Sequence, residues 1–374
     1  MPNERNIRLA ARRTGNPFLS ASRQFRLACM AIPSERFSPD ELDNCLRHYD
    51  LGDILEVKPF SGGSRLAPKV LIETSKGKFL FKRRAKGKDD LAKVAFTHQI
   101  QVKLADECFP MPHLIPIHSG KKSMLVVPPR VYEMFEFIEG SNYDGSPEST
   151  FQAGRTLGIY HELLEGFKSD YRPPKGTYHD AETITQAIRS IVGSLPLKYR
   201  PPANVVTATV SSIEEAYTSC AARANDLGLA DWPIQIVHGD WHPGNMLFRD
   251  RCVVAVIDYD AARMQQRVID LANGALQFSI IGGKDAPANW PVNVDQGRFR
   301  KFMQGYDSVS VVSTRELQAI PLLMCEAMIA EAVLPIAATG SFGGMQGFPF
   351  LQMIESKVNW ILSHTDILYA AVDG

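Results

Sequence analysis

Two short apolar runs around three polar residues place the strongest constraint on how this chain folds. Residues 245–248 read NMLF and residues 252–258 read CVVAVID, with RDR between them at 249–251. Strand-forming runs joined by a tight polar turn predict a β-hairpin. An antiparallel hairpin places the start of its first strand beside the end of its second, so we expect Asn245 and Asp258 to lie close together.

A third polar side chain precedes the hairpin. Asp240 comes five residues before Asn245 in the sequence HGDWHPGN, across a turn that contains Pro243 and Gly244. We therefore expect two carboxylates and one amide oxygen to converge at the same end of the hairpin. Such oxygen donors suit Mg²⁺, which takes few protein ligands and keeps positions open for phosphate oxygens and water.

This arrangement meets the requirements of phosphoryl transfer. Asp240 would orient an attacking hydroxyl and accept its proton, while Asn245 and Asp258 would bind the Mg²⁺ that neutralises charge on the phosphates. The order HxDxxxxN, followed by a strand and a further aspartate, is also the order in the catalytic loop and metal-binding segment of protein kinases. The pattern therefore predicts an ATP-dependent kinase that uses Mg²⁺.

The remaining periodicities predict a fold of two lobes. The first part of the chain shows the patterns of three strands with Gly/Ser turns, a helix and two more strands (53–60, 67–74, 78–84, 89–107, 123–127 and 132–140). Helical patterns dominate from residue 148 onward, apart from the hairpin region. We predict an α+β, two-lobed fold like that of protein kinases. A small antiparallel β-sheet N-lobe with one helix would occupy 31–139, and a larger, mainly helical C-lobe at 140–374 would carry the hairpin.

The composition excludes several other classes of protein. The 374 residues include 41 basic and 41 acidic side chains, and this balance argues against a nucleic-acid partner or a membrane-surface role. Apolar runs such as VVAVI at 253–257 are too short to span a bilayer. Six widely spaced cysteines without metal-binding spacing indicate reduced thiols, so we expect a cytoplasmic protein.

The start of the chain differs from the rest. Residues 1–30 contain six arginines and one acidic residue and no long apolar segment, which argues against a secretory signal. We expect a disordered basic extension, or an upstream start codon with Met30 as the true first residue. An Arg-rich transit peptide is the alternative.

The sequence resembles the aminoglycoside phosphotransferase family, a kinase-like group that includes choline, fructosamine and type II homoserine kinases. The resemblance is carried by VHGDWHPGNMLF and VIDYDAA and extends over about residues 50–340, with FEFIEG as the linker between lobes and AGRTLGIYHELL as the first helix of the larger lobe. It implies ATP as the phosphate donor and Mg²⁺ as the metal ion. It also implies a small-molecule acceptor with a hydroxyl group, of the homoserine, choline, sugar or aminoglycoside type.

The resemblance implies roles outside the hairpin as well. Lys82, on the third strand, would contact the α- and β-phosphates, and the hinge from Glu136 to Ile138 would bind adenine through backbone groups. The loop over the phosphates would be the sequence SGGSR, whose small residues let backbone N–H groups approach an anion (Ser61, Gly62, Gly63 and Ser64).

Two features depart from the related kinases. Family members usually pair this lysine with a glutamate in the following helix, but that helix has no acid between Asp90 and Asp106. Either an acid at an end of the helix or the nucleotide alone would then position Lys82. The catalytic loop also lacks the arginine of protein kinases, and no APE sequence follows it, so the parts that read activation-loop phosphorylation are missing. A small-molecule acceptor is therefore favoured over a protein.

The histidines near the motif are expected to support the structure rather than to transfer protons. His238 would hydrogen-bond the backbone of its own loop, and His161 would pack within the helical lobe or support the site residues without touching a ligand. His242 would be exposed and replaceable.

Three acids allow more than one interpretation. Asp260 would assist the metal, bind a cationic substrate or cap the next helix. Glu326 and Glu331 lie in an apolar helical stretch at 319–337, where they would form a solvated edge or, for one of them, face the acceptor pocket.

Two other functions remain open. A pseudokinase that binds ATP and signals through its conformation is supported by the missing helix acid, whereas the joint presence of Asp240, Asn245 and Asp258 argues against it. A protein kinase of atypical type would keep the fold and change the acceptor to a protein side chain. The sequence does not define an oligomeric state.

Overall fold

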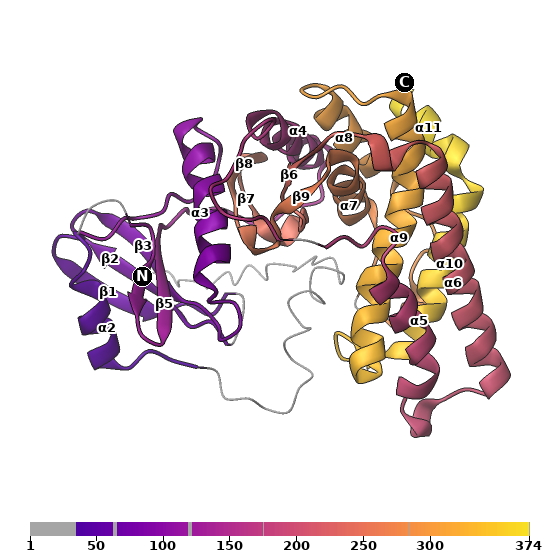
Figure 1. Ribbon diagram of the computed structural model, residues 1–374, viewed down its shortest axis with the longest axis horizontal. Helices are drawn as coiled ribbons and strands as arrows, with labels where there is room; N and C mark the ends of the chain where they lie inside the picture. The colour runs from indigo at the N-terminus through magenta and orange to yellow at the C-terminus, as the bar shows by residue number, and fades with distance from the viewer. Residues whose placement is uncertain (1–34, 63–65, 119–121, 175, 284, 374) are drawn as a thin grey trace, which may run out of the picture.

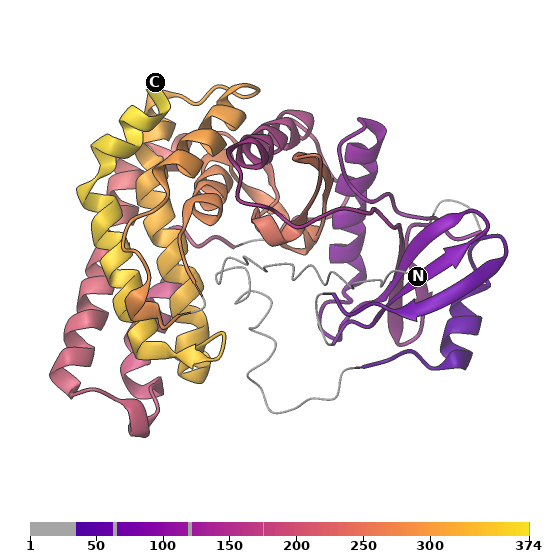
Figure 2. The ribbon, with the colours of Figure 1, turned by 180° about the vertical axis from the view of Figure 1, so that it is seen from behind.

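The chain folds into a sheet-based N-lobe and a helical C-lobe, with short two-stranded sheets between them (Figures 1 and 2). This computed structural model describes most of the chain (35–62, 66–118, 122–174, 176–283 and 285–373). The predicted basic extension at 1–30 lies outside the described residues. The predicted fold class, α+β with a kinase-like arrangement of two lobes, is confirmed.

The N-lobe is built on an antiparallel sheet with the strand order β1-β2-β3-β5-β4. Its strands fall close to the predicted segments (β1 Ile54–Pro59, β2 Lys69–Thr74, β3 Gly77–Arg83, β4 Leu125–Val127 and β5 Arg130–Glu136). β3 lies between β2 and β5, and its register places Lys82 directly opposite Glu133 of β5. This register decides which charges meet at the inner face of the sheet.

Two helices pack against the sheet. The short helix α2, Pro39–Leu46, begins with a capping box in which Ser38 and Glu41 exchange hydrogen bonds. Helix α3, Leu91–Asp106, begins at Asp90, whose carboxylate accepts the Lys93 N–H at 2.9 Å. α3 lies between the sheet and the C-lobe hairpin, so its side chains can reach both lobes (Figure 1).

The predicted hairpin forms, with β7 at Met246–Arg249 and β8 at Cys252–Val256. Asp250 and Arg251 turn the chain with φ of 49° and 65°, the left-handed pair that a two-residue hairpin turn requires. A second small sheet pairs β6, Ile234–Val237, with β9, Arg263–Gln266, a strand that the sequence patterns did not indicate.

The linker between the lobes is attached to this hairpin. Ser141 and Phe248 exchange two backbone hydrogen bonds, at 2.8 and 2.9 Å. The segment that follows β5 is therefore held directly against β7, and the hairpin lies where the two lobes meet (Figure 2).

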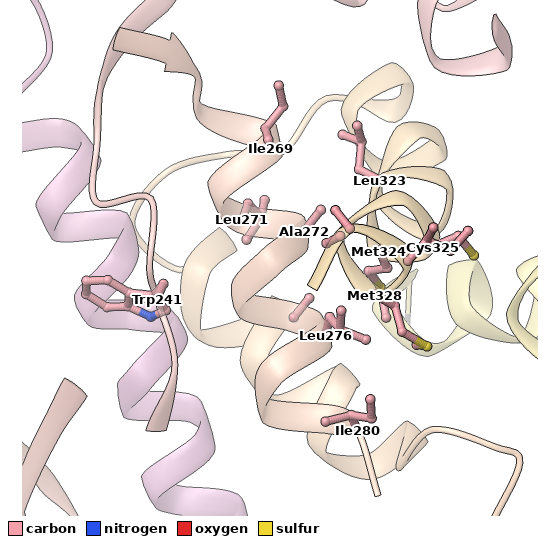
Figure 3. Close-up of a cluster of buried hydrophobic side chains, with 14 of the residues drawn as sticks. Trp241, Ile269, Leu271, Ala272, Leu276, Ile280, Leu323, Met324, Cys325 and Met328 are labelled. Carbon is pink, nitrogen blue, oxygen red and sulfur yellow. The ribbon is translucent and has the colours of Figure 1, made fainter. Parts of the chain in front are cut away.

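The C-lobe consists mainly of helices packed around a single long one. Their bounds follow the chain (α4 Pro147–Leu163, α5 Glu182–Ser194, α6 Ala203–Asp226, α7 Arg267–Ser279, α8 Gln296–Asp307, α9 Thr314–Thr339, α10 Gly347–Ser363 and α11 Thr365–Asp373). A small hairpin of β10, Ser341–Phe342, and β11, Met345–Gln346, follows α9. In Figure 3, Ala272 and Leu276 of α7 lie on the side toward α9, where Met324 and Met328 point toward them.

Helix α9 is long and apolar enough, by length and composition alone, to cross a membrane, with a mean hydropathy of 1.8 over its most apolar window. That window is 89% buried inside the C-lobe. Its apolar surface is covered by α5, α6, α7 and α10 (Figure 1), so α9 is the core helix of the lobe.

Two glycines allow α4 and α8 to pack with their backbones in contact. A Cβ on Gly154 of α4 would lie 1.9 Å from the Phe302 carbonyl oxygen, and a Cβ on Gly305 of α8 would lie 2.0 Å from that of Phe151. Either side chain would force the two helices apart. This contact also holds α8 against the helix that follows the linker.

We expect Gly154→Ala to lower the free energy of unfolding by about 3 kcal/mol, because the neighbouring atom is backbone and cannot move aside. Gly193→Ala is the control, since a Cβ at this site in α5 meets no atom within 4 Å. It should leave stability unchanged or raise it by up to about 1 kcal/mol. Urea unfolding of both variants measures the difference. Equal midpoints would show that the α4–α8 contact tolerates a side chain.

Candidate active site

The hairpin brings Asn245 and Asp258 together, as its pattern predicted. Asn245 precedes β7 and Asp258 follows β8, and the Ile257 N–H donates to the Asn245 carbonyl oxygen at 2.9 Å. Asp258 has φ 69° and ψ 69°, a left-handed conformation that is uncommon for a residue with a Cβ. Backbone pairing on one side therefore holds a strained aspartate in place.

Asp240 joins this pair through the side chain of Asn245. The Asn245 amide nitrogen donates to the Asp240 carboxylate and to the Asp240 carbonyl oxygen, both at 3.0 Å. These two bonds orient the amide and leave Oδ1 as the atom of Asn245 available to a ligand. The Asp240 side chain is 42% exposed, so a small molecule can reach the carboxylate.

The environment of Asp240 favours its ionised form. Burial raises the pKa of this carboxyl, but the His242 imidazole and the Asn245 amide beside it outweigh burial and lower the pKa to about 2. His242 Nε2 lies 3.5 Å from Asp240 Oδ1. Because His242 Nδ1 accepts the Gly244 N–H at 3.0 Å, the ring hydrogen lies on Nε2 and faces the carboxylate.

The expectation that His242 is exposed is wrong. The residue is 6% exposed, because the Pro-Gly turn folds its backbone back onto the ring and directs the other ring nitrogen toward Asp240. A turn sequence alone does not show on which side the flanking side chain lies.

Asp270 of α7 holds the loop that carries Asp240, and sequence reasoning missed it. Its carboxylate accepts the backbone N–H groups of His238 and Gly239 at 2.9 and 3.0 Å, and lies 3.3 Å from His161 Nε2. Gly239 has φ 74°, and a Cβ there would lie 2.5 Å from the Ala261 carbonyl oxygen. The signal in the sequence was an aspartate flanked on both sides by apolar residues in VIDLA.

His161 and His238 both serve the structure, as expected, although His238 does so differently from the prediction. The His238 ring packs against Trp241 and Tyr259 at centroid distances of 5.3 and 5.2 Å. Within the described part of the chain its ring nitrogens have no hydrogen-bond partner, and burial lowers its pKa. Its backbone, through Asp270, makes the bond that was expected of its side chain.

Lys82 is paired with Glu133, so both expectations about its partner are wrong. Its Nζ lies 3.3 Å from Glu133 Oε2, and the Glu133 side chain is 1% exposed. The two residues face each other on adjacent antiparallel strands, where opposite charges form a cross-strand pair. Burial lowers the pKa of Lys82, but the carboxylates of Glu133 and Asp260 outweigh it, so the ammonium stays protonated.

Glu133 is the centre of a buried network of charges. Besides Lys82 it contacts His98 Nε2 of α3 at 2.8 Å and Arg84 Nη1 at 2.6 Å. These three groups together outweigh burial and hold its pKa below the ordinary value. His98 of α3 therefore faces the Lys82–Glu133 pair, and the carboxylate of that pair comes from strand β5 instead of from α3.

Asp260 does not cap the next helix, because α7 begins after Gln266, and its carboxylate is ion-paired instead. Its Oδ1 lies 2.6 Å from Arg84 Nη2, and its Oδ2 lies 3.9 Å from Lys88 Nζ. It stands in the single turn Tyr259–Ala261 that follows Asp258. The carboxylate therefore connects the turn after Asp258 to the end of β3.

The hinge and the loop after β1 are described in part. The N–H groups of Glu136 and Phe137 donate to His113 and Lys78 carbonyl oxygens at 2.9 and 3.0 Å, so both are already hydrogen-bonded within the N-lobe. Ser61 and Gly62 follow β1, and Lys69 Nζ donates to the Gly62 carbonyl oxygen at 3.0 Å. The other two predicted loop residues lie outside the described residues (Gly63 and Ser64).

The two acids of α9 differ from a solvated edge. Glu326 is fully buried and contacts His179 Nδ1 at 3.0 Å. Glu331 accepts two hydrogen bonds from Gln277 Nε2, both at 2.8 Å. Burial and the charge of Asp240 raise the pKa of Glu331 to about 7, so this acid lies near enough to the candidate base to repel it.

The fold and the site together define a kinase-like phosphotransferase. The phosphotransferase enzyme family, APH, matches residues 56–310, and the chain belongs to this family. It is therefore a small-molecule phosphotransferase with a hydroxyl group as acceptor. A comparison with curated protein sequences finds no match.

Solved structures show the same fold at low identity. An aminoglycoside phosphotransferase from Alicyclobacillus acidocaldarius superposes with a TM-score of 0.62 at 14% identity, over 88% of this chain and 94% of its own. Amicoumacin kinase hAmiN, solved with AMP-PNP, Ca²⁺ and Ami, gives 0.62 at 12%, over 86% and 94%. A microcompartment-associated aminopropanol kinase gives 0.62 at 13%, over 90% and 99%.

We expect Glu331→Gln to stabilise the protein at pH 8 but not at pH 4.5. The native pKa of Glu331 is about 7 against an ordinary 4.5, so the wild type loses stability as the pH rises through this window, and glutamine removes the loss. Thermal unfolding between pH 4.5 and 8 measures the difference. Glu215→Gln, on the exposed side of α6, is the control. A constant difference between Glu331→Gln and wild type across this range would contradict the prediction.

Proposed function

We propose that this protein transfers the γ-phosphoryl group of ATP to a hydroxyl group of a small polar metabolite, with Mg²⁺ as the metal ion. The observation that carries the proposal is the hydrogen bond of the Asn245 amide to Asp240, at the end of the β7–β8 hairpin where backbone pairing holds Asn245 opposite Ile257, next to Asp258. The Lys82–Glu133 pair in the N-lobe supports the same proposed function.

In this proposal Asp240 is the catalytic base. Its lowered pKa keeps it ionised at neutral pH, and its exposed carboxylate can accept a hydrogen bond from the acceptor hydroxyl. Phosphoryl transfer passes through a loose transition state, so orienting the hydroxyl contributes more than removing its proton early. Asn245 fixes the carboxylate in that orientation.

Asn245 and Asp258 would bind the metal ion. An amide oxygen and a carboxylate are hard donors that suit Mg²⁺, and two protein ligands leave positions for phosphate oxygens and water. Within the ranges that the structure describes, no three His, Cys, Asp or Glu side chains gather as a metal site. This donor set agrees with a metal that arrives with the nucleotide, where it would neutralise charge on the phosphates.

The nucleotide would bind between the lobes. Lys82 would contact the α- and β-phosphates, and the loop after β1 would cover them (Ser61, Gly62, Gly63 and Ser64). Because the N–H groups of Glu136 and Phe137 are already hydrogen-bonded within the N-lobe, adenine would be recognised through the Glu136 carbonyl oxygen and the backbone of Ile138. The AMP-PNP and Ca²⁺ in the hAmiN complex support ATP and a divalent ion as the ligands.

The acceptor would bind in the C-lobe beside Asp240. Homoserine-like, choline-like, sugar and aminoglycoside acceptors all carry a suitable hydroxyl. The aminopropanol kinase and aminoglycoside phosphotransferase among the similar structures support an amine-bearing acceptor.

The pseudokinase alternative loses its support. It rested on the missing acid in α3, and Glu133 of β5 now supplies a carboxylate for Lys82. A protein acceptor is disfavoured because the catalytic loop lacks the arginine of protein kinases and no APE sequence follows it.

We expect Asp240→Asn to lower kcat by about 10²–10⁴-fold with little change in ATP affinity, because asparagine keeps the shape but cannot accept the proton. Mg²⁺-dependent ATP consumption with pooled amino acids, amino-alcohols, sugars and aminoglycosides measures it. Asp250→Asn is the matched control, since it lies at the opposite end of the same hairpin in a left-handed turn that asparagine favours.

Turnover of one pool that is lost in Asp240→Asn and kept in Asp250→Asn would support the proposal and begin to identify the acceptor. Equal activity of wild type and Asp240→Asn would exclude Asp240 as the base. Absence of Mg²⁺-dependent nucleotide binding by the wild type would exclude the kinase function altogether.

A further inference from the structure

One guanidinium joins the two lobes beside the candidate nucleotide site. Arg84 follows the last residue of β3, and its three nitrogens each have a partner. Nη1 lies 2.6 Å from Glu133 Oε1, Nη2 lies 2.6 Å from Asp260 Oδ1, and Nε donates to the Lys88 carbonyl oxygen at 2.5 Å. The Arg84 side chain is 6% exposed, so its contact with Glu133 is fully buried and its contact with Asp260 is partly buried.

This contact is the principal charged connection between the lobes. Among the described residues, the ion pairs that join 35–139 to 140–373 are those of Asp260, with Arg84 and, more distantly, with Lys88. Both Arg84 contacts are short and their groups are largely buried, unlike exposed ion pairs, which contribute little. Removing one member would leave a buried charge without its partner.

The two carboxylates that Arg84 joins each stand beside a group with a proposed role. Glu133 lies against Lys82, and Asp260 lies two residues after Asp258. Asp258 has a left-handed φ of 69°, so the turn that contains it must be held by its surroundings. The Ala262 N–H to Tyr259 carbonyl bond closes that turn, and Arg84 holds it from the N-lobe.

Arg84 also affects which carboxylate the Lys82 ammonium contacts. The carboxylates of Glu133, Asp260 and Asp258 all attract the Lys82 ammonium. Because Arg84 occupies Glu133 Oε1 and Asp260 Oδ1, Lys82 keeps only the 3.3 Å contact with Glu133 Oε2. Without Arg84, the Asp260 carboxylate would be free to draw the Lys82 ammonium away from the phosphates.

We propose that Arg84 and Asp260 form an interlobe ion pair that positions Lys82 and Asp258 together for the nucleotide and its metal ion. Arg84 is thus a positioning residue: it acts through Glu133 and Asp260 and does not itself contact the substrate. This inference rests on the proposed function, because Lys82 and Asp258 matter only if a nucleotide binds there.

Arg83 provides a matched control on the same strand. It is 8% exposed and is also ion-paired twice, with Glu41 at 2.6 Å and Glu35 at 2.6 Å. Its partners lie near α2, on the opposite face of the sheet from Glu133. Arg83→Gln therefore removes an equally buried guanidinium and two ion pairs from the neighbouring position without touching the interlobe contact.

The experiment compares Arg84→Gln, Asp260→Asn, the double variant and Arg83→Gln with the wild type. We expect Arg84→Gln and Asp260→Asn each to weaken ADP binding in the presence of Mg²⁺ by at least about tenfold, measured by calorimetry. The double variant should lose little more than either single variant, because both act through one contact. The KM for ATP should rise with them, and Arg83→Gln should change neither value.

A second readout needs no ligand. Hydrogen exchange of the backbone at 257–262 in the nucleotide-free protein should become faster in Arg84→Gln and in Asp260→Asn, and should stay at the wild-type rate in Arg83→Gln. A general loss of stability would instead speed exchange throughout the N-lobe in both arginine variants. Thermal unfolding of each variant separates these two effects.

Two results would overturn the inference, and they are distinguishable. If the wild type binds ADP and Mg²⁺ but Arg84→Gln and Asp260→Asn behave like Arg83→Gln in binding and exchange, the interlobe pair has no positioning role. If the wild type binds no nucleotide at all, the proposed function fails and this role fails with it. Asp260→Asn keeps the test decisive if Arg84→Gln does not fold.

Discussion

Backbone pairing in the β7–β8 hairpin holds Asn245 beside Asp258, and the rest of the candidate site depends on this contact. The Ile257 N–H bonds the Asn245 carbonyl oxygen, and the Asn245 amide then orients the Asp240 carboxylate. The backbone register thereby fixes the side chains of Asn245 and Asp240 and the backbone position of Asp258. Such preorganised oxygen donors suit a reaction whose catalysis consists mainly of positioning and charge neutralisation.

Two buried carboxylates hold the residues of the site in this arrangement. Asp270 accepts hydrogen bonds from two backbone N–H groups of the loop that carries Asp240. Glu133 contacts Lys82, Arg84 and His98. A buried carboxylate is costly without partners, so each of these acids constrains every group that it binds. The two networks act in different lobes: Asp270 orders the C-lobe loop, and Glu133 orders the N-lobe lysine.

The helical lobe provides the rigid base for these contacts. Asp270 stands on α7, which packs against the buried core helix α9 (Figure 3). Gly154 and Gly305 allow α4 to lie close to α8. The charge of Asp240 acts on Glu331 of α9, so the core helix also carries an acid near the candidate base. Helix α9 therefore both stabilises the lobe and carries an acid near the candidate base.

The sequence by itself determined the hairpin, the strands of the N-lobe and the grouping of Asp240, Asn245 and Asp258, because these depend on periodicity and on contacts between residues close in the chain. Only the tertiary structure decided the partner of Lys82, the bond between Arg84 and Asp260, which lie 176 residues apart, and the burial of His242. These features depend on which strands become neighbours and how the lobes meet. Opposite charges attract equally well in many pairings, so a list of charged residues does not select one until the fold brings particular groups within about 3 Å of each other.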